Sequence, residues 1–285
     1  MVRARSVRDL ERLSLELRRD AIEAIFRAGS GHPGSALSTM DVLIALYFGG
    51  ILRHDPKHPA WDERDFFLLS NGHACPGLYA VLAHAGYFPR EELVTGLRKL
   101  GTGFQGHPKR GMLPGIEISS GSLGQGLSVG LGLARALTLQ KRKNHVVVMM
   151  SDGEQEEGST WEAVMLGAKL KLPNLLAIVD KNGMQIDGPT ATVMPSLDPL
   201  GAKYQAFGWE VLEIDGHNMG MILAEVPVAF RNIAQGRPTV VIAHTVRGHG
   251  VSFMEGSPKW HAGKITEEEY AQAMRDLGGN VVAHA

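Results

Sequence analysis

The sequence has little that would tie it to a membrane, a nucleic acid or an oxidising compartment. Its only cysteine is Cys75, so no disulfide can form within the chain, which suits a reducing compartment. Lysine and arginine number 29 against 30 aspartates and glutamates, so no global field favours nucleic acid or a charged surface. No apolar run approaches the roughly 20 residues of a membrane span. We therefore expect a cytoplasmic protein with neither nucleic acid nor membrane as a partner.

The N-terminal segment is charged at helical spacing and has no continuous apolar core, unlike a signal peptide. When residues 1–29 are wound as a helix, one apolar stripe forms, made of Leu10, Leu13, Leu17, Ala21 and Ile25. The stripe predicts an amphipathic helix that packs on the rest of the domain.

Short apolar runs alternate with helical segments through the rest of the chain. The predicted strands are 66–69, 146–150, 175–179, 211–214 and 239–244, and the predicted helices are 40–48, 77–85, 126–140, 159–171, 221–234 and 266–278. This alternation indicates an α/β fold, a mostly parallel sheet with helices on both faces. We expect one domain over residues 1–285. The long loop at 101–121, rich in glycine and proline, is typical of a functional or partner-covered segment.

Two predicted strands are followed by side chains that carry oxygen. The strand at 146–150 leads into Asp152, and the strand at 175–179 leads into Asn182. Ligands of open α/β sheets bind at the carboxyl ends of the strands, so both side chains are expected to face one ion. A carboxylate and a carboxamide are hard donors, which favours Mg²⁺, and a carbonyl near Met184 could add a third oxygen. Ca²⁺ or Mn²⁺ are alternatives.

A plainer interpretation treats the same residues as turns. Asp152-Gly153 and Asn182-Gly183 are both common turn-forming dipeptides. The metal site therefore depends on whether the two strand ends lie side by side.

Two helix starts carry the pattern of a capping box. Ser159 and Glu162 stand three residues apart after the first of these strand ends, which predicts Ser159 as the N-cap residue of the helix. Thr266 begins the same pattern near the C-terminal end, with Glu269 three residues later.

A glycine-rich segment precedes the helix at 126–140. Gly121, Gly124 and Gly126 let the backbone approach a ligand closely, and the helix N-terminus that follows favours an anion. Tight helix packing is the alternative explanation for the glycines, and it applies at least to Gly130 and Gly132.

Four of the twelve histidines stand in glycine-rich or strand-end turns. They are His32 in SGHPG, His73 in SNGHA, His107 in QGHPK and His261 in KWHAG. Imidazole titrates near neutrality and can both donate and accept a proton, so these four are candidate catalytic groups. A structural or surface role is the alternative for each one alone. His249, in RGHG, is a rival that we rank below the four.

The segment SDG at 151–153, followed by Asn182, resembles the thiamine diphosphate motif, with Ser151 and Lys181 at positions where that motif usually has glycine and asparagine. Four further segments narrow the resemblance to transketolase, namely 28–38, 69–80, 106–134 and 259–263. The resemblance is to the N-terminal half of a transketolase.

The resemblance implies thiamine diphosphate and Mg²⁺ as cofactors. Asp152, Asn182 and the Met184 carbonyl would hold the metal, and Gly153 would admit a diphosphate oxygen. The matching glycine and leucine of the family touch the aminopyrimidine ring, which implies that role for Gly121 and Leu123.

The resemblance also gives roles to the histidines. His32 and His261 would flank the C3 hydroxyl of the substrate and help to deprotonate it. His73 and His107 would bind the C1 and C2 oxygens, and His73 would also contact the cofactor. Glu157 matches an acid at the subunit boundary of the family, although a solvated acidic loop is an equally plain explanation.

Whole transketolases carry a pyrimidine-binding domain and a C-terminal domain that have no counterpart here. The resemblance therefore implies the N-terminal subunit of a split transketolase, active only with a C-terminal partner subunit in a heterotetramer. The reaction would transfer a two-carbon ketol unit from a ketose phosphate to an aldose phosphate. Two alternatives stay open. One is another split thiamine enzyme, like a 2-oxoacid dehydrogenase alpha subunit or a deoxyxylulose phosphate synthase; the other is a non-catalytic regulatory subunit.

Overall fold

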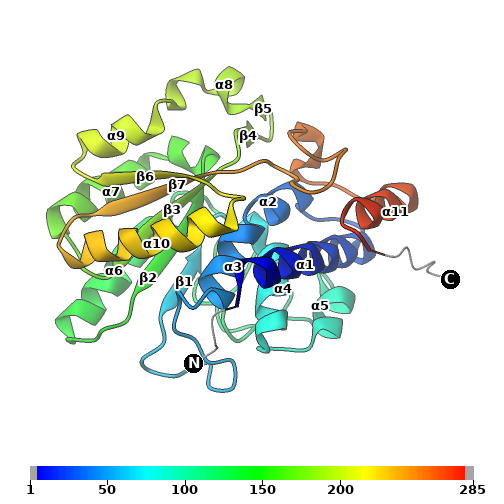
Figure 1. Ribbon diagram of the computed structural model, residues 1–285, viewed down its shortest axis with the longest axis horizontal. Helices are drawn as coiled ribbons and strands as arrows, with labels where there is room; N and C mark the ends of the chain where they lie inside the picture. The colour runs from blue at the N-terminus through cyan, green and yellow to red at the C-terminus, as the bar shows by residue number, and fades with distance from the viewer. Residues whose placement is uncertain (1–4, 280–285) are drawn as a thin grey trace.

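A parallel sheet forms the centre of the computed structural model, which describes residues 5–279 (Figure 1). Its five strands run in the order β1 (Phe66–Leu69), β2 (Val146–Ser151), β3 (Leu175–Lys181), β7 (Thr239–His244) and β6 (Glu210–Asp215). Neighbouring strands are parallel at each step. Strand β2 is buried from end to end and β3 is buried up to its last residue, Lys181, as expected of apolar strands covered on both faces.

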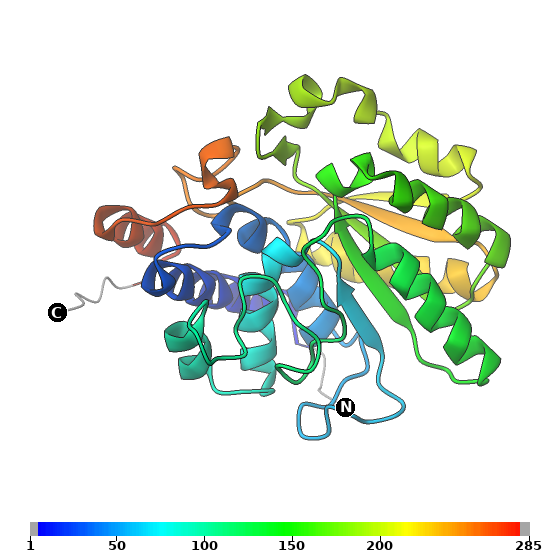
Figure 2. The same ribbon diagram turned by 180° about the vertical axis from the view of Figure 1, so that it is seen from behind.

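Helices cover both faces of the sheet, as Figures 1 and 2 show from opposite sides. The apolar core on one face includes side chains of α1 (Val7–Ala28), α3 (Met40–Phe48), α4 (Cys75–Ala85) and α10 (Met219–Ala234). The other face packs against α6 (Gly126–Leu139), α7 (Gly158–Leu170) and α9 (Leu200–Ala206). Side chains along each strand alternate between the two apolar cores, because successive residues of a strand point to opposite faces. The predicted α/β architecture is confirmed.

The amphipathic helix predicted at the N-terminal end is α1. The five residues of its apolar stripe are all buried, and α1 packs along α4 and α5 (Arg90–Gly96). The capping box predicted at Thr266 is also confirmed: it opens α11 (Glu267–Asp276), which packs against α1.

The capping box predicted at Ser159 is wrong. Helix α7 begins at Gly158 with Glu157 as the N-cap residue. The Ser159 hydroxyl instead donates to the Gly124 carbonyl, 3.0 Å away. The serine therefore ties α7 to the glycine-rich segment, and this long-range bond replaces the local one that the spacing suggested.

Several short elements were not predicted. They are α2 (Pro33–Ser38), α5, α8 (Thr190–Val193), α9, the hairpin of β4 (Met184–Gln185) and β5 (Gly188–Pro189), and the 3₁₀ turns Gly72–Ala74, Gly153–Glu156, Pro195–Leu197 and Pro258–His261. The loop expected at 101–121 contains neither helix nor strand. No helix within residues 5–279 is long and apolar enough to cross a membrane.

Candidate functional site

A cavity of about 200 Å³ opens at the carboxyl ends of β2 and β3. These two strands are direct neighbours, with Ser151 paired to Asp180, so the two strand ends singled out in the sequence lie side by side. The residues around the cavity are His73, Leu123, Ser151, Asp152, Gly153, Met184, Gln185, Ile186, Arg247 and His261.

Asp152 is the acid of this cavity, and it is buried. Its two oxygens accept hydrogen bonds from the backbone N–H groups of Gly153, at 2.9 Å, and Gly183, at 2.7 Å. Burial, together with the neighbouring carboxylate of Asp180, raises the pKa of Asp152 to about 7. A buried carboxylate that only backbone amides contact is poorly compensated, so the site suits a bound cation.

Two further oxygens lie near Asp152. The Asn182 side chain is buried, its amide nitrogen donates to Asp180 at 3.2 Å, and its oxygen accepts from the Met184 N–H at 3.1 Å. The Met184 carbonyl accepts a hydrogen bond from Arg247, and a carbonyl oxygen has a second lone pair. A carboxylate, a carboxamide and a carbonyl are oxygen donors that fit Mg²⁺ or Ca²⁺.

The four histidines singled out in the sequence meet beside the cavity. The centroid of the His32 ring lies 5.5 Å from each of the rings of His73, His107 and His261, and the rings of His73 and His261 are 5.4 Å apart. They come from four separate segments of the chain. An antiparallel bridge between Gly31 and Gly263 brings the first and last of these segments together.

Burial is the main reason why the pKa values of these histidines are low. The pKa of His32 falls to about 4 through burial and the nearby His261 and His107. Burial and Arg247 lower the pKa of His261 to about 4. The pKa values of His73 and His107 are lowered as well, again mainly by burial. At neutral pH the cluster is therefore uncharged and able to accept protons.

Arg247 was not singled out in the sequence, although it is a central residue of the cavity. It is only 2% exposed, and it donates to the Nδ1 atom of His261 at 2.8 Å and to the Met184 carbonyl. Its Nε atom is buried without a hydrogen-bond partner among the described residues. Because a guanidinium can only donate, Nδ1 of His261 is the acceptor and the ring proton is on Nε2. The position of Arg247, three residues after the end of β7, was the available signal.

The glycine-rich segment lies beside the same cavity, with Leu123 in its lining. Gly121 has φ 145°, and a Cβ atom there would lie 3.1 Å from the His107 ring, so the position favours glycine. The Gly124 N–H donates to the Glu154 carboxylate at 2.8 Å.

Glu154 is a second residue that the sequence did not single out for the site. It is fully buried and accepts hydrogen bonds from the Ser70 hydroxyl, the Gly124 N–H and the Ser151 N–H. The carboxylate thus links the ends of β1 and β2 to the glycine-rich segment. The solvated acidic loop considered for Glu157 does not extend to Glu154, because Glu154 is buried.

The structure places Glu157 and His249 outside the cavity lining. Glu157 is exposed and occupies the N-cap position of α7, where its side chain makes no capping hydrogen bond to the described residues. His249 stacks on His217, with ring centroids 3.6 Å apart, and belongs to a separate polar cluster described below.

Comparison with known proteins identifies the family. Residues 11–283 match the family model described as transketolase, thiamine diphosphate binding domain. The chain belongs to the transketolase family. It is 43% identical over 269 residues to the 6-deoxy-6-sulfo-D-fructose transketolase subunit SqwG of Clostridium sp. (strain MSTE9), covering 94% of this chain and 96% of that one. It is also 43% identical over 277 residues to one subunit of the apulose-4-phosphate transketolase of Phocaeicola vulgatus, covering 96% of both chains.

Full-length transketolases match over a smaller share of their own length. Human transketolase is 35% identical over 264 residues, which are 92% of this chain but 41% of the human protein. A crystal structure of the Pichia stipitis transketolase with sedoheptulose 7-phosphate superposes with a TM-score of 0.87 at 32% identity, covering 96% of this chain and 41% of that one. The transketolase fold expected from the sequence is thereby confirmed for this chain, and it corresponds to the thiamine diphosphate-binding part of those enzymes.

Proposed function

We propose that this chain is the N-terminal subunit of a transketolase that uses thiamine diphosphate and a divalent cation. The enzyme would transfer a two-carbon ketol unit from a ketose to an aldose. The observation that carries the proposal is the meeting of four neutral imidazoles beside a cavity that contains the buried Asp152. Transketolase subunits of similar length among its relatives support it.

The residues in and beside the cavity divide into a metal side and a ring side. Asp152, Asn182 and the Met184 carbonyl would hold the cation, which we propose to be Mg²⁺. Arg247 supplies positive charge for a diphosphate, and Gly153 leaves its backbone accessible. On the ring side, Gly121 and Leu123 would lie against the aminopyrimidine. When bound, the cofactor supplies the electron sink for breaking and forming carbon–carbon bonds.

The hydrogen bonds of the histidines suggest distinct proton roles. His261 has its proton on Nε2, because Nδ1 accepts from Arg247, so it would donate to a substrate oxygen. His32 makes no side-chain hydrogen bond within residues 5–279 and is proposed to accept the proton of the C3 hydroxyl. His73, whose Nε2 lies 3.0 Å from the Ser35 hydroxyl, and His107 would hold the C1 and C2 oxygens.

We also propose a heterotetramer, made of two copies of this chain and two of a C-terminal partner subunit. This chain corresponds to 41% of the human enzyme, so the rest of the site would come from elsewhere. Helices α6 and α7 expose apolar side chains that a partner could cover, including Val129, Met165 and Leu166. Glu157, at the start of α7, would lie at this subunit boundary.

The substrate class follows from the relatives rather than from the cavity. The two similar subunits are named for a sulfonated ketose and a ketose phosphate. We propose that this enzyme also acts on a ketose with an anionic tail, whose recognition involves the partner subunit. The site of action is proposed to be the cytoplasm, where the buried Cys75 would stay reduced.

The test is a ketol transfer assay from xylulose 5-phosphate to ribose 5-phosphate with thiamine diphosphate and Mg²⁺. The chain is assayed alone and then with its C-terminal partner. Activity only in the mixture would support the split enzyme. Cofactor binding without any transfer would redirect the search to other ketoses, and the absence of cofactor binding in the mixture would overturn the proposal.

A further inference from the structure

Arg247 lies on a short segment that leaves the end of β7, and this segment is held at successive residues. The Thr245 N–H donates to the Lys181 carbonyl at 3.2 Å, and its hydroxyl donates to Asp180. The Gly248 N–H donates to the Gly34 carbonyl at 3.0 Å. Between them, the Val246 N–H donates to the Nε2 atom of His217 at 2.8 Å.

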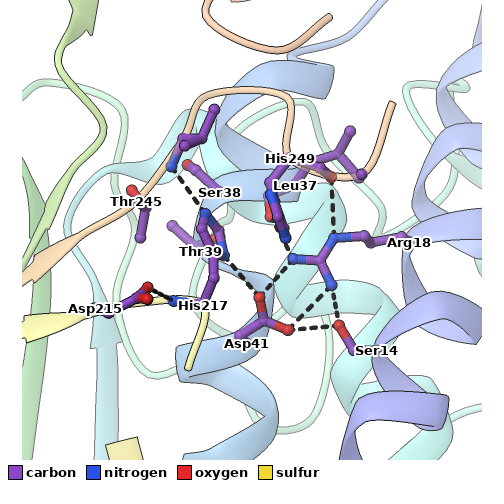
Figure 3. A network of polar contacts seen from close by, with 12 residues as sticks. Ser14, Arg18, Leu37, Ser38, Thr39, Asp41, Asp215, His217, Thr245 and His249 are labelled. Carbon is purple, nitrogen blue, oxygen red and sulfur yellow. Dashed lines mark hydrogen bonds and ion pairs between the residues drawn. The ribbon is translucent and has the colours of Figure 1, made fainter. Parts of the chain in front are cut away.

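His217 therefore connects the backbone beside Arg247 to a buried acid. Figure 3 shows the His217 ring between Asp41 and the segment that begins at Thr245. Its Nδ1 atom lies 2.8 Å from the Asp41 carboxylate. Because the Val246 N–H can only donate, Nε2 of His217 must be the acceptor and Nδ1 must carry the proton. The two bonds fix both the tautomer and the orientation of the ring.

Asp41 is itself held as a carboxylate. Arg18 donates to its oxygens at 2.7 and 3.1 Å, and the Ser14 hydroxyl donates at 2.5 Å. Burial alone would raise the pKa of Asp41, but Arg18 and the bonds from His217 and Ser14 hold it well below its usual range. An acceptor that stays charged at all working pH values can keep the His217 proton on Nδ1.

The same cluster could be taken for a metal site, because donor atoms of Asp41, His217 and His249 lie within 4.8 Å of one another. Two observations argue against a cation there. Both nitrogens of His217 already have partners, and the Arg18 guanidinium contacts the carboxylate that would bind the metal. The His249 ring stacks on His217 at 3.6 Å and 17°, which covers one face of the ring. These contacts indicate that the cluster holds its side chains in place and does not bind a cation.

We infer that His217, held by Asp41, is a positioning residue that fixes the backbone at Val246 and thereby aims Arg247 into the cavity. The bond to Val246 is one residue from Arg247, and the neighbouring bond at Gly248 stabilises the other side. Arg247 packs tightly, since a Cβ at Gly34 would lie 2.6 Å from its Cγ atom, so a small backbone shift would displace the guanidinium from His261 and Met184. The link to cofactor binding rests on the proposed function.

Substitutions at His217 can separate its two bonds. Glutamine reaches about as far as Nε2 and can accept from the Val246 N–H, whereas asparagine reaches only about as far as Nδ1 and keeps the Asp41 contact. H217Q should therefore retain the position of Arg247, and H217N and H217A should lose it. The control is H244A, because His244 ends the same strand but is exposed, and among residues 5–279 its side chain pairs only with Glu213 at the surface.

The first readout is the tautomer of His261. It is measured by ¹⁵N NMR of the two ring nitrogens in the full chain without cofactor. We expect Nδ1 to be the unprotonated atom in the natural chain, in H217Q and in H244A. We expect a mixture of tautomers in H217A and H217N, because Arg247 no longer donates to Nδ1. His261 signals that stay unchanged in H217A and H217N would overturn the inference. A mixture of His261 tautomers in H217Q as large as that in H217N would also overturn it.

The second readout is the dissociation constant of thiamine diphosphate with Mg²⁺, measured by calorimetry on the chain together with its partner. H217N should bind about tenfold more weakly than H217Q, a size typical of losing an outer support of a ligand site. When R247M is combined with each of these variants, the difference in dissociation constant between H217N and H217Q should disappear. An altered His261 tautomer with unchanged cofactor affinity would uphold the positioning role and overturn the diphosphate role proposed for Arg247.

Discussion

The Asp152 carboxylate is an acid whose native environment opposes its charge. Its pKa is about 7 in the folded chain, whereas an unfolded aspartate titrates near its usual value of 3.8. The folded state therefore holds the proton of Asp152 more tightly than the unfolded state does. As the pH rises from about 3.8 to about 7, the contribution of Asp152 to the free energy of unfolding falls, and above about pH 7 it stays at its lowest value. Above pH 7 the unpaired charge destabilises the chain unless a cation binds.

The D152N substitution should therefore stabilise the chain in the presence of a chelator at about pH 8. We expect a gain of about 1–3 kcal/mol in the free energy of unfolding, shrinking as the pH falls toward about 4. The gain is less than the full cost of the charge, because asparagine replaces one of the two oxygens that accept from Gly153 and Gly183. Denaturant titrations at about pH 8 and about pH 5 measure it.

A bound metal should affect the stability of the natural chain but not that of the D152N variant. Mg²⁺ with thiamine diphosphate should raise the melting temperature of the natural chain and leave D152N unchanged. An equal rise in both would show that Asp152 is not a metal ligand.

The position of His32 gives a second prediction at the scale of single residues. The H32A substitution should lower kcat about 10²- to 10⁴-fold in the assembled enzyme while leaving cofactor affinity unchanged, because His32 would act on the substrate proton and not on the diphosphate. The matched control is H58A, since the His58 side chain is 76% exposed and, in the described part of the chain, pairs only with Asp55. Steady-state kinetics and calorimetry separate the effects, and normal turnover in H32A would move the proton role to another histidine.

Local patterns located some residues of the site and missed others for a physical reason. Asp152 and the four histidines stand in strand ends and glycine-rich turns, which single-sequence patterns can mark. Arg247 also stands near a strand end, in RGHG, but its role, like that of Glu154, depends on partners from other parts of the chain. Arg247 bonds to Met184, 63 residues away, and Glu154 bonds to Ser70, 84 residues away. Such roles depend on the fold and not on spacing.

Among the secondary-structure elements, helix α6 shows how one residue type can have opposite effects. Gly130 faces the sheet, where a Cβ atom would lie 2.4 Å from a methyl group of Val148. Gly132 is exposed, and a Cβ there would meet nothing within 4 Å. Tight packing against the sheet therefore explains Gly130 and does not explain Gly132.

The two glycines provide a matched pair of substitutions. G130A should destabilise the chain by about 1–3 kcal/mol, because the added methyl group overpacks the contact with β2. G132A should stabilise it by about 0.5–1 kcal/mol, because alanine favours the helix and has free space. Denaturant unfolding of the two variants of the isolated chain measures the difference. Changes of the same sign would contradict this account of the α6 packing.

Long elements were easier to predict than short ones. Helix α1 and strands β2, β3 and β7 have strong apolar periodicity or β-branched runs, and their predicted positions are confirmed. The four-residue α8 and the two-residue strands β4 and β5 are too short for a period to show. The start of α7 was misplaced because Ser159 bonds to Gly124, a contact that only the folded chain creates.

At the scale of the whole molecule, α6 and α7 expose apolar side chains that a partner chain would bury. Val129 is 47% exposed, Met165 is 50% exposed and Leu166 is 45% exposed, although the two helices pack against each other and against the sheet. Exposed apolar side chains on two neighbouring helices are typical of a protein interface. Since the similar full-length transketolases continue beyond the matched region, the proposed partner subunit is the natural occupant of this surface.

The L166E substitution tests this assignment. A glutamate at this exposed site should change the free energy of unfolding of the isolated chain by no more than about 0.5 kcal/mol, because surface substitutions seldom matter to folding. It should weaken association with the partner at least about tenfold, because the interface would then have to bury an unpaired charge. K169E, on the same helix, reverses a charge without removing apolar surface and serves as the control. Denaturant unfolding of the isolated chain and sedimentation of the mixed subunits measure the two effects, and full assembly of L166E would place the partner on another face.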